Sequence, residues 1–333
     1  MSGLDTPPAR PSQEALDQPA GSGLSALDQR VAVVIVTFNR ADLLRRCLDG
    51  LARQTRPPDS VIVVDNASAD HTRAVIEAYA GLPMQPIHAA ENLGGAGGFE
   101  LGVRTAYAQG NDRIWLMDDD VVPAPDCLAT LLAHPGPCLM AVREDTSGRL
   151  CEKAAITFDL TNPLAIRPKR QSVEEKYGSR AAMPAEVPIQ NVAFEGFMVA
   201  REVIDAIGLP DPAYFIFYDD VDFALRARRA GFPIVAVRDA VLVRQLDFDQ
   251  QHDTRSWKGY YMYRNLFLVH QRYGANVLVR WKPLWITLAV LALAPLRGGR
   301  AEARNVWQAW RDSRRMAAAG PGVRLPGAPR PPR

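Results

Sequence analysis

The chain has 333 residues, of which 47% are hydrophobic and 23% charged. This composition excludes a disordered or fibrous protein and allows one large folded domain or two small ones. The net charge of +2 is uneven, because residues 280–333 contain eleven lysines and arginines but two acids and carry +9, which leaves −7 on residues 1–279. The basic end indicates an anionic partner, with membrane phospholipid as the candidate and a soluble arginine-rich helix as the alternative.

Residues 1–28 are rich in proline, serine, glycine and alanine and contain no apolar core. They predict a disordered N-terminal lead and no secretion signal. The four cysteines form no Cys-x-x-Cys pair, and Cys47 falls on the apolar face of a predicted helix. The expected compartment is therefore the reducing cytosol.

Alternating strand and helix patterns occupy the first third of the chain. Val31–Thr37 and Ser60–Asp65 are continuous apolar, β-branched runs, as expected for strands buried on both faces of a parallel sheet. A third apolar run covers Ile114–Met117. This repetition predicts an α/β fold with a mainly parallel sheet and right-handed crossovers. Helical spacing falls between these strands at residues 43–51, at 75–79 and, after a glycine-rich turn at 94–98, at 99–106.

Polar side chains follow the ends of these strands, where ligands bind in α/β sheets. Asp118, Asp119 and Asp120 come directly after the third run, and Asp65 ends the second. Neighbouring carboxylates raise one another's pKa, so a hard divalent cation such as Mg²⁺ or Mn²⁺ is the expected neutralising group. Side chains alternate along an extended segment, so Asp118 and Asp120 are expected to point to one side and Asp119 to the other.

The middle of the chain, residues 143–188, is rich in charge and proline and predicts an irregular surface insertion. A short helix is expected at 201–207. A second acidic cluster, Asp219–Asp222, then follows the aromatic run Tyr214–Tyr218 and opens another helix. The helix dipole favours acids in a first turn, which accounts for one of these carboxylates but not for three.

Beyond Trp257 an aromatic helix is expected, followed by the apolar run Leu284–Leu296. Thirteen residues are too few to cross a bilayer, which needs about 20. Flanking arginines and the tryptophans at 281 and 285 indicate an interfacial membrane anchor. A buried core helix or a dimer contact, and hence a homo-oligomer, is the alternative.

Several motifs together resemble the family 2 inverting glycosyltransferases, whose GT-A fold is a mixed, mainly parallel sheet flanked by helices. The resemblance covers residues 31–245 and is greatest to bacterial galactofuranosyltransferases, followed by rhamnosyltransferases. It implies a GT-A domain, expected at 29–250. The residue patterns beyond it predict a C-terminal helical, membrane-associating region at 251–318 and a disordered tail at 319–333. The motifs are Val33–Arg40, Val63–Ser68, Glu91–Phe99, Asp118–Asp120 and Tyr218–Arg226, with Tyr263–Asn265 typical of the galactofuranosyl enzymes.

The resemblance also implies a role for each motif residue. Asp220 is the candidate catalytic base, and Asp118 and Asp120 are the candidate ligands of Mn²⁺ or Mg²⁺. Asp65 would accept a hydrogen bond from the nucleotide base, with a cap of its own loop as the alternative. By the same resemblance, Thr37, Asn39 and Arg40 would line the nucleotide cleft, and Asn92 and Gly94 would allow the donor to approach the backbone closely. Asp119 would contact the ribose or the sugar. Asp219 and Asp222 would orient neighbouring side chains or contact acceptor hydroxyls.

One departure from the family pattern concerns the metal. Family members often carry a histidine 20–25 residues after the base, and the stretch Val241–Asp247 has none. Asp247, Asp249 and His252 are the candidates to replace this histidine as a metal ligand. The alternative is that Arg244 neutralises the diphosphate directly. Arg264 has two alternative roles, a contact with phosphate or cation–π packing beside Tyr261 and Tyr263.

The sequence thus predicts a metal-dependent inverting glycosyltransferase, cytoplasmic and peripheral on the inner leaflet of the membrane. The expected donor is UDP-galactofuranose, with dTDP-rhamnose second, and the expected acceptor is a lipid-linked or cell-envelope glycan. A haloacid-dehalogenase-like phosphatase is disfavoured because at least two strand–helix units precede the aspartate triplet. A catalytically silent sugar-nucleotide-binding module is the other alternative. A Rossmann dehydrogenase is disfavoured because no glycines follow the first strand, and no nucleic-acid partner is expected.

Overall fold

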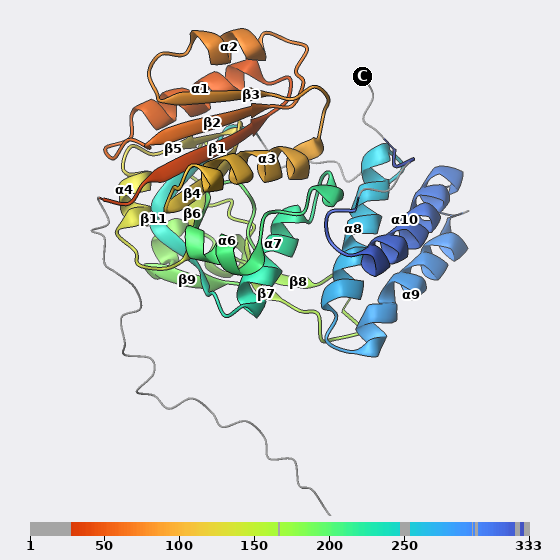
Figure 1. Ribbon diagram of the computed structural model, residues 1–333. Helices are drawn as coiled ribbons and strands as arrows, with labels where there is room; N and C mark the ends of the chain where they lie inside the picture. The colour runs from red at the N-terminus through yellow and green to blue at the C-terminus, as the bar shows by residue number, and fades with distance from the viewer. Residues whose placement is uncertain are drawn as a thin grey trace, which may run out of the picture.

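A mixed, mainly parallel sheet flanked by helices forms the body of the protein, and three helices pack beside it (Figure 1). The computed structural model describes residues 28–165, 167–246, 254–294, 296, 299–323 and 327–329. Most of the predicted N-terminal lead and much of the predicted tail lie outside these residues. The strands are β1 (Val31–Thr37), β2 (Ser60–Asp65), β3 (Met84–His88), β4 (Arg113–Asp118), β5 (Val121–Pro123), β6 (Cys138–Asp145), β7 (Ala155–Phe158), β8 (Lys169–Ser172), β9 (Glu186–Ile189), β10 (Phe197–Ala200) and β11 (Ile234–Arg244). The helices are α1 (Ala41–Ala52), α2 (Thr72–Ala78), α3 (Gly94–Ala108), α4 (Cys127–Leu132), α5 (Val173–Tyr177), α6 (Arg201–Ile207), α7 (Asp219–Arg229), α8 (Trp257–Tyr273), α9 (Val277–Leu293) and α10 (Gly299–Ala319).

The order of strands in the main sheet is β3-β2-β1-β4-β10-β6-β11-β5, with β9 paired to β11. β1 pairs in parallel with β2 on one side and with β4 on the other. The register sets Thr37 opposite Asp65 and Val36 opposite Asp118, so the polar strand ends meet at one edge, as predicted. β1 is therefore the point where the chain changes direction across the sheet, the place where α/β sheets bind ligands.

Alternate residues of β1 enter two separate cores. Ala32, Val34 and Val36 face the layer that contains α3, α6 and α7, whereas the odd-numbered residues face the layer of α1, α2 and α4. Both faces are covered, which explains why β1 and β2 are apolar without interruption. All four cysteines are buried and free, as expected for packing residues.

The glycines after Asn92 lie in a helix and not in the turn that was predicted for residues 94–98. They form the first turns of α3 and no separate turn precedes the helix. A Cβ on Gly98 would lie 2.6 Å from a methyl group of Val36, and one on Gly102 would overlap Val34. Gly98 and Gly102 thus let α3 pack closely on β1, whereas Gly94 and Gly95 line the cavity described below, with open space where a Cβ of Gly95 would lie.

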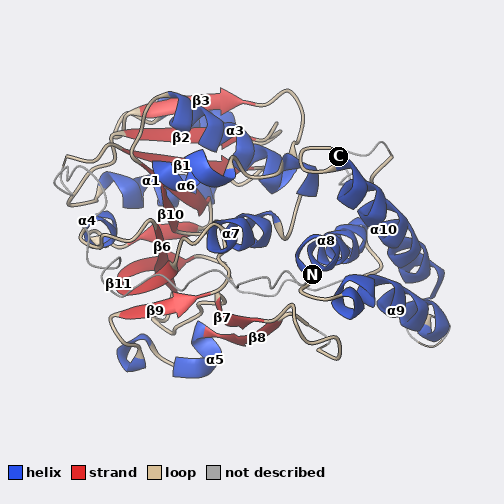
Figure 2. Cartoon of the chain, turned by 60° about the horizontal axis from the view of Figure 1, so that its bottom comes forward, coloured by secondary structure: helices blue, strands red, loops and turns tan. Residues whose placement is uncertain are grey.

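The prediction of an irregular insertion at 143–188 is wrong in part. This stretch contains the antiparallel hairpin β7–β8 and the short helix α5, and β9 extends the main sheet. The aromatic helix beyond Trp257 is α8, and the apolar run begins inside α9. Helices α8, α9 and α10 form a bundle at one side of the sheet (Figure 2). In the part of the chain that the structure describes, no helix has the length and hydropathy needed to cross a bilayer.

Candidate active site

A cavity of about 770 Å³ lies where β1 and β4 end. Its walls come from the aspartate triplet, the N-terminus of α7 with the aromatic loop before it, the β7–β8 hairpin and the segment before β10. Both predicted acidic clusters open onto this one cavity, which is the arrangement that the sequence interpretation required. Its charged lining residues are Arg40, Asp118, Asp119, Asp120, Arg143, Lys153, Lys169, Glu195, Asp219, Asp220, Arg244 and Lys258.

Asp119 is held by two neighbours from the end of β1 and the turn after it. Thr37 Oγ1 donates a hydrogen bond to Asp119 Oδ2 over 2.7 Å, and Arg40 Nη1 lies 3.0 Å from Asp119 Oδ1. Burial raises the pKa of Asp119 to about 6, although Arg40 and Thr37 act against this rise. Thr37 and Arg40 therefore line the cavity and also hold Asp119 on its wall.

Within the part of the chain that the structure describes, Asp120 carries the one oxygen of the triplet that is buried without a partner. Asp120 Oδ1 is buried and has no hydrogen-bond partner among the described residues, and Asp120 Oδ2 lies 3.5 Å from Arg40 and 3.7 Å from Arg244. Burial, and then repulsion from Glu195 and the adjacent aspartates, raises the pKa of Asp118 well above its usual range. Buried carboxylates without partners fit a divalent cation, which would supply the missing charge.

The described residues hold no group of three histidine, cysteine, aspartate or glutamate side chains arranged for a metal ion. The protein would thus offer two carboxylates, and Mg²⁺ and Mn²⁺ commonly take their other ligands from water and substrate phosphate. The suggested substitutes Asp247, Asp249 and His252 lie outside the described residues. Arg244, the other alternative, does line the cavity beside Asp120.

Glu195 is a site residue that the sequence interpretation missed. It lies between two buried arginines, with Arg244 Nη1 2.8 Å and Arg143 Nη1 2.5 Å from Glu195 Oε2. Burial opposes its ionisation, but the guanidinium groups of Arg143 and Arg244 outweigh burial and lower the pKa of Glu195. The sequence feature that could have indicated Glu195 is a single acid between Phe194 and the apolar run that becomes β10.

The start of α7 carries the second acidic cluster, as predicted. Asp220 Oδ1 accepts a hydrogen bond from the backbone N–H of Val221 over 2.7 Å. Burial raises the pKa of Asp220 to about 6, and burial followed by the charge of Asp220 raises the pKa of Asp219 further. A carboxylate with a pKa close to neutral pH has the proton affinity that a general base needs.

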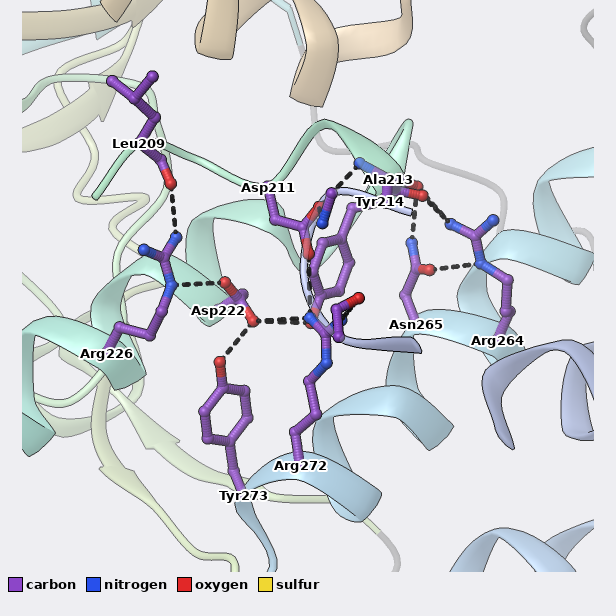
Figure 3. A network of polar contacts seen from close by, with 12 residues as sticks. Leu209, Asp211, Ala213, Tyr214, Asp222, Arg226, Arg264, Asn265, Arg272 and Tyr273 are labelled. Atoms are coloured by element: carbon purple, nitrogen blue, oxygen red, sulfur yellow. Dashed lines mark hydrogen bonds and ion pairs between the residues drawn. The ribbon is translucent and has the colours of Figure 1, made fainter. Parts of the chain in front are cut away.

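Asp222 does not line the cavity, so a contact with substrate is not supported, and of its two expected roles the contact with neighbouring side chains is the one observed. Its carboxylate is 1% exposed and accepts hydrogen bonds from the hydroxyls of Tyr214 and Tyr273, at 2.9 and 2.5 Å. Arg226 Nε donates to its other oxygen over 2.9 Å, and Arg272 lies 3.5 Å away (Figure 3). Asp222 thus joins α7 to α8 and serves the fold.

The aromatic loop between the 3₁₀ turn at 212–214 and α7 has a strained backbone. Phe215, Phe217 and Tyr218 have φ angles of 64°, 66° and 67°, the left-handed region that residues with a Cβ rarely adopt. Such conformations cost about 1–3 kcal/mol each and persist where the surroundings enforce them, often at functional sites. Phe215, Ile216 and Phe217 of this loop all line the cavity.

Asn265 and Arg264 of α8 enforce that conformation. Asn265 Nδ2 donates to the carbonyls of Tyr214, Ile216 and Phe217 at 2.7 to 3.0 Å. Arg264 Nη2 donates to the carbonyls of Ala213 and Tyr214, and its guanidinium lies 4.6 Å from the ring of Tyr261 (Figure 3 shows both side chains). Of the two alternatives for Arg264, packing is the one observed, because this residue is buried and outside the cavity lining.

Gly94 is required where the start of α3 meets the aromatic loop. Its φ is 73°, and a Cβ there would overlap the carbonyl oxygen of Phe215. Asn92 Oδ1 accepts from the N–H of Gly94 over 2.8 Å, and Asn66 Nδ2 donates to the Gly94 carbonyl over 2.9 Å. Asn92 and Gly94 line the cavity as expected, and Asn66 joins them.

Asp65 and Asn39 are not among the residues that line the cavity. Asp65 Oδ1 accepts from the N–H of Ser68 over 2.9 Å, which is the loop cap given above as the alternative. Asp65 Oδ2 lies 3.1 Å from His88 Nδ1. Asn39 Oδ1 accepts from the N–H of Ala69 over 2.7 Å, so both residues order the loop beside the cavity.

The fold and the site are those expected of a glycosyltransferase, and the comparison with known proteins shows the family. The chain belongs to the glycosyltransferase family described as "Glycosyltransferase like family 2", whose model matches residues 29–265. It is 30% identical over 305 residues to galactofuranosyltransferase GlfT1 of Mycobacterium tuberculosis, covering 87% of this chain and 96% of that one. The protein is a glycosyltransferase with galactofuranosyltransferase homologues.

Solved structures confirm the GT-A fold. The mannosyltransferase PcManGT from Pyrobaculum calidifontis, in complex with GDP-Man and Mn²⁺, superposes with a TM-score of 0.51 at 21% identity over 92% of this chain and 81% of that one. GalNAc-T7 with UDP, GalNAc and Mn²⁺ gives a TM-score of 0.57 at 14% identity over 87% and 57% of the respective chains.

Proposed function

We propose that this glycosyltransferase transfers galactofuranose, with inversion, from a UDP-linked donor to a hydroxyl of a glycan acceptor. The observation that carries the mechanism is that the aspartate triplet and Asp220 line one cavity from different elements. The sugar follows from the similarity to GlfT1 over nearly the whole length of both chains. Rhamnose from a dTDP-linked donor is the second candidate, as the motifs resemble those of rhamnosyltransferases.

The donor would lie along the ends of β1 and β4. Thr37, Arg40 and Asn92 line this part of the cavity, and Gly95 leaves room for a close approach of the diphosphate to the backbone. Arg40 and Arg244 carry the positive charge nearest the triplet and would pair with phosphate oxygens. Asp119 would accept from a hydroxyl of the ribose or the sugar, and Asp65 and Asn39 would order the loop around the nucleotide base.

Asp118 and Asp120 would hold Mn²⁺ or Mg²⁺. Their burial, their raised pKa values and the partnerless Oδ1 of Asp120 fit a divalent cation. PcManGT and GalNAc-T7 were both solved with Mn²⁺, which supports the same choice. Such an ion supplies Lewis-acid stabilisation of the charge that develops on the departing diphosphate.

Asp220 would accept the proton of the attacking acceptor hydroxyl. Inversion requires attack on the sugar from the face opposite the diphosphate, and Asp220 lies on another element than the triplet. Asp219 would position that hydroxyl or its neighbours. Glu195, between Arg143 and Arg244, would keep both guanidiniums directed at the cavity.

The acceptor would be a lipid-linked or cell-envelope glycan bound against the aromatic loop. Phe215, Phe217 and Trp257 line the cavity, and Phe215 packs on Tyr261 with 5.0 Å between ring centroids. Aromatic rings offer flat apolar surface to the carbon face of a sugar while its hydroxyls keep polar partners.

A panel of sugar nucleotides tests the proposal. UDP-galactofuranose, dTDP-rhamnose and UDP-N-acetylglucosamine are incubated with the full chain and Mn²⁺, with and without membrane extract, and release of nucleoside diphosphate is followed. We expect UDP release from UDP-galactofuranose to rise with extract and to cease with a chelator. Consumption of dTDP-rhamnose alone would favour the second candidate, and hydrolysis of phosphate monoesters without any donor would support a phosphatase. Binding of donors without turnover would support a silent module.

A further inference from the structure

Helix α9 exposes a continuous apolar stripe. Trp281, Trp285 and Leu288 follow one another at helical spacing and are 55%, 61% and 46% exposed. Val277 and Leu278 extend the stripe at 66% and 63% exposure. Large apolar side chains in a contiguous exposed row mark an interaction surface.

The opposite face of α9 is fixed to the rest of the protein. Lys282 Nζ donates to the carbonyls of Asn162 and Ala165, at 3.0 and 2.7 Å, in the loop between β7 and β8. Asn276 caps the helix through a 3.0 Å bond from the N–H of Val279 and donates to the carbonyl of Thr161. The stripe therefore cannot turn inward without breaking these bonds.

A groove of about 250 Å³ adjoins the stripe, between α9 and α10. Trp281 and Arg280 contribute one wall, and Trp310 and Arg314 the other. Gln271 of α8 also lines the groove, and its Oε1 is buried without a hydrogen-bond partner among the described residues. Two guanidiniums and two indoles, with that buried amide oxygen at the base, suit a phosphate that carries a hydroxylated group.

The surroundings of the groove are basic. Across the described residues, arginines 280, 300, 304 and 314 form no ion pair with a carboxylate, and α9 contains no acid. Trp307 of α10 is 48% exposed beside them. Tryptophans flanked by arginines at the edge of an apolar surface are typical of a membrane interface.

We propose that α9 and α10 dock the enzyme on an anionic phospholipid bilayer. The stripe of α9 enters the boundary between headgroups and acyl chains, and the groove holds one headgroup phosphate between Arg280 and Arg314. A second copy of the chain is the weaker occupant, because a two-fold contact would place this basic surface against itself.

The docking surface is also connected to the cavity. The β7–β8 loop that binds Lys282 and Asn276 leads directly to Lys169 of β8, which lines the active site. Docking through α9 would thus place the cavity at a fixed distance from the bilayer. The inference itself rests on the surface alone and is measured without turnover, so it stands or fails separately from the proposed reaction.

Vesicle co-sedimentation of the full chain tests the proposal. We expect binding to vesicles of phosphatidylglycerol and phosphatidylcholine, at least tenfold weaker binding to pure phosphatidylcholine, and weakening by salt. The double variant Trp281→Ser/Trp285→Ser and the double variant Arg280→Glu/Arg314→Glu should each lose at least tenfold in partitioning.

The matched control is Arg45→Glu/Arg46→Glu, which reverses two exposed arginines on α1 at the far end of the molecule (Figure 1). It should bind vesicles like the wild type. Thermal unfolding and UDP binding establish that each variant is folded. Equal binding to both lipid compositions, or wild-type binding by the groove variant, would overturn the headgroup site. A dimer in light scattering that disappears with Trp281→Ser/Trp285→Ser would assign the stripe to a second copy instead.

Discussion

Two acidic clusters lie close together in this protein, and their carboxylates differ in what surrounds them. In the triplet, Asp120 Oδ1 is buried without a partner and Asp118 faces the cavity. In the α7 cluster, Asp222 is equally buried, yet two tyrosine hydroxyls and an arginine satisfy it. Burial alone therefore does not identify a functional acid. A buried carboxylate that lacks partners retains the capacity to bind an ion or a proton, and a satisfied one holds elements together.

Asp220 belongs to the same turn as Asp222 but shares the environment of the triplet, so replacing it should have the largest effect. Asp220→Asn keeps the shape of the side chain and removes its ability to accept a proton. We expect kcat to fall about 10²- to 10⁴-fold, the usual contribution of a general base, while the Kd of UDP in a calorimetric titration stays within a few-fold. Asp42→Asn, at an 85% exposed side chain on α1, is the control and should leave kcat unchanged. Turnover of Asp220→Asn near the wild-type rate would remove Asp220 from the mechanism.

Asp222→Asn should have the opposite profile, a loss of stability rather than of chemistry. The substitution leaves Arg226 and Arg272 without their shared carboxylate in a largely buried network. We expect a loss of about 3–5 kcal/mol in the free energy of unfolding, measured by urea denaturation. Tyr273→Phe removes one hydrogen bond from the same carboxylate and should cost about 1 kcal/mol. Should folded Asp222→Asn lose its turnover at full stability, the distinction between the two clusters would be wrong.

The sequence carried enough information for the strands and for most of the site. Continuous apolar runs marked β1, β2 and β4, and residues at their ends meet because parallel strands end at one edge. Glu195 was not predicted as a site residue because it is isolated in the sequence. Its role depends on Arg143 of β6 and Arg244 of β11, which are distant in the chain.

Other misses have the same physical origin. The hairpin β7–β8 has only four residues in each strand, too few for a clear period-2 pattern, and tertiary bonds from Lys282 of α9 hold its connecting loop. The role of Asp222 stayed open between neighbouring side chains and the acceptor, because spacing along α7 cannot distinguish a residue that faces Tyr214 and Tyr273 from one that faces the cavity. Partners distant in the chain decide both cases.

The aromatic loop allows a sharper test, because it borders both clusters. Asn265→Ala removes three hydrogen bonds to the strained segment that ends at Tyr218. We expect unfolding to become easier by about 1–3 kcal/mol, with a larger fractional loss in kcat than this destabilisation explains. Asn111→Ala is the matched control, a buried amide that bonds the Ala106 carbonyl away from the cavity. It should cost stability alone, and equal kcat losses in both variants would deny the loop any part in turnover.

The smallest expected effect is a displacement of the acidic limb of the pH profile. A general base must be ionised, and burial raises the pKa of Asp220 to about 6, so the active fraction falls as pH drops below about 6. An ordinary aspartate would place this limb near pH 4. The value of kcat/KM should therefore fall about tenfold per pH unit below pH 6.

The pKa of Asp119 is also about 6, so the contributions of Asp119 and Asp220 to the pH profile must be distinguished. Asp119 lies on the donor side with Thr37 and Arg40, and its protonation should weaken UDP binding, whereas that of Asp220 should not. If the affinity for UDP stays constant from pH 5 to 7 while the rate of transfer declines, the acidic limb belongs to Asp220. If UDP affinity and transfer decline together, the limb belongs to the triplet.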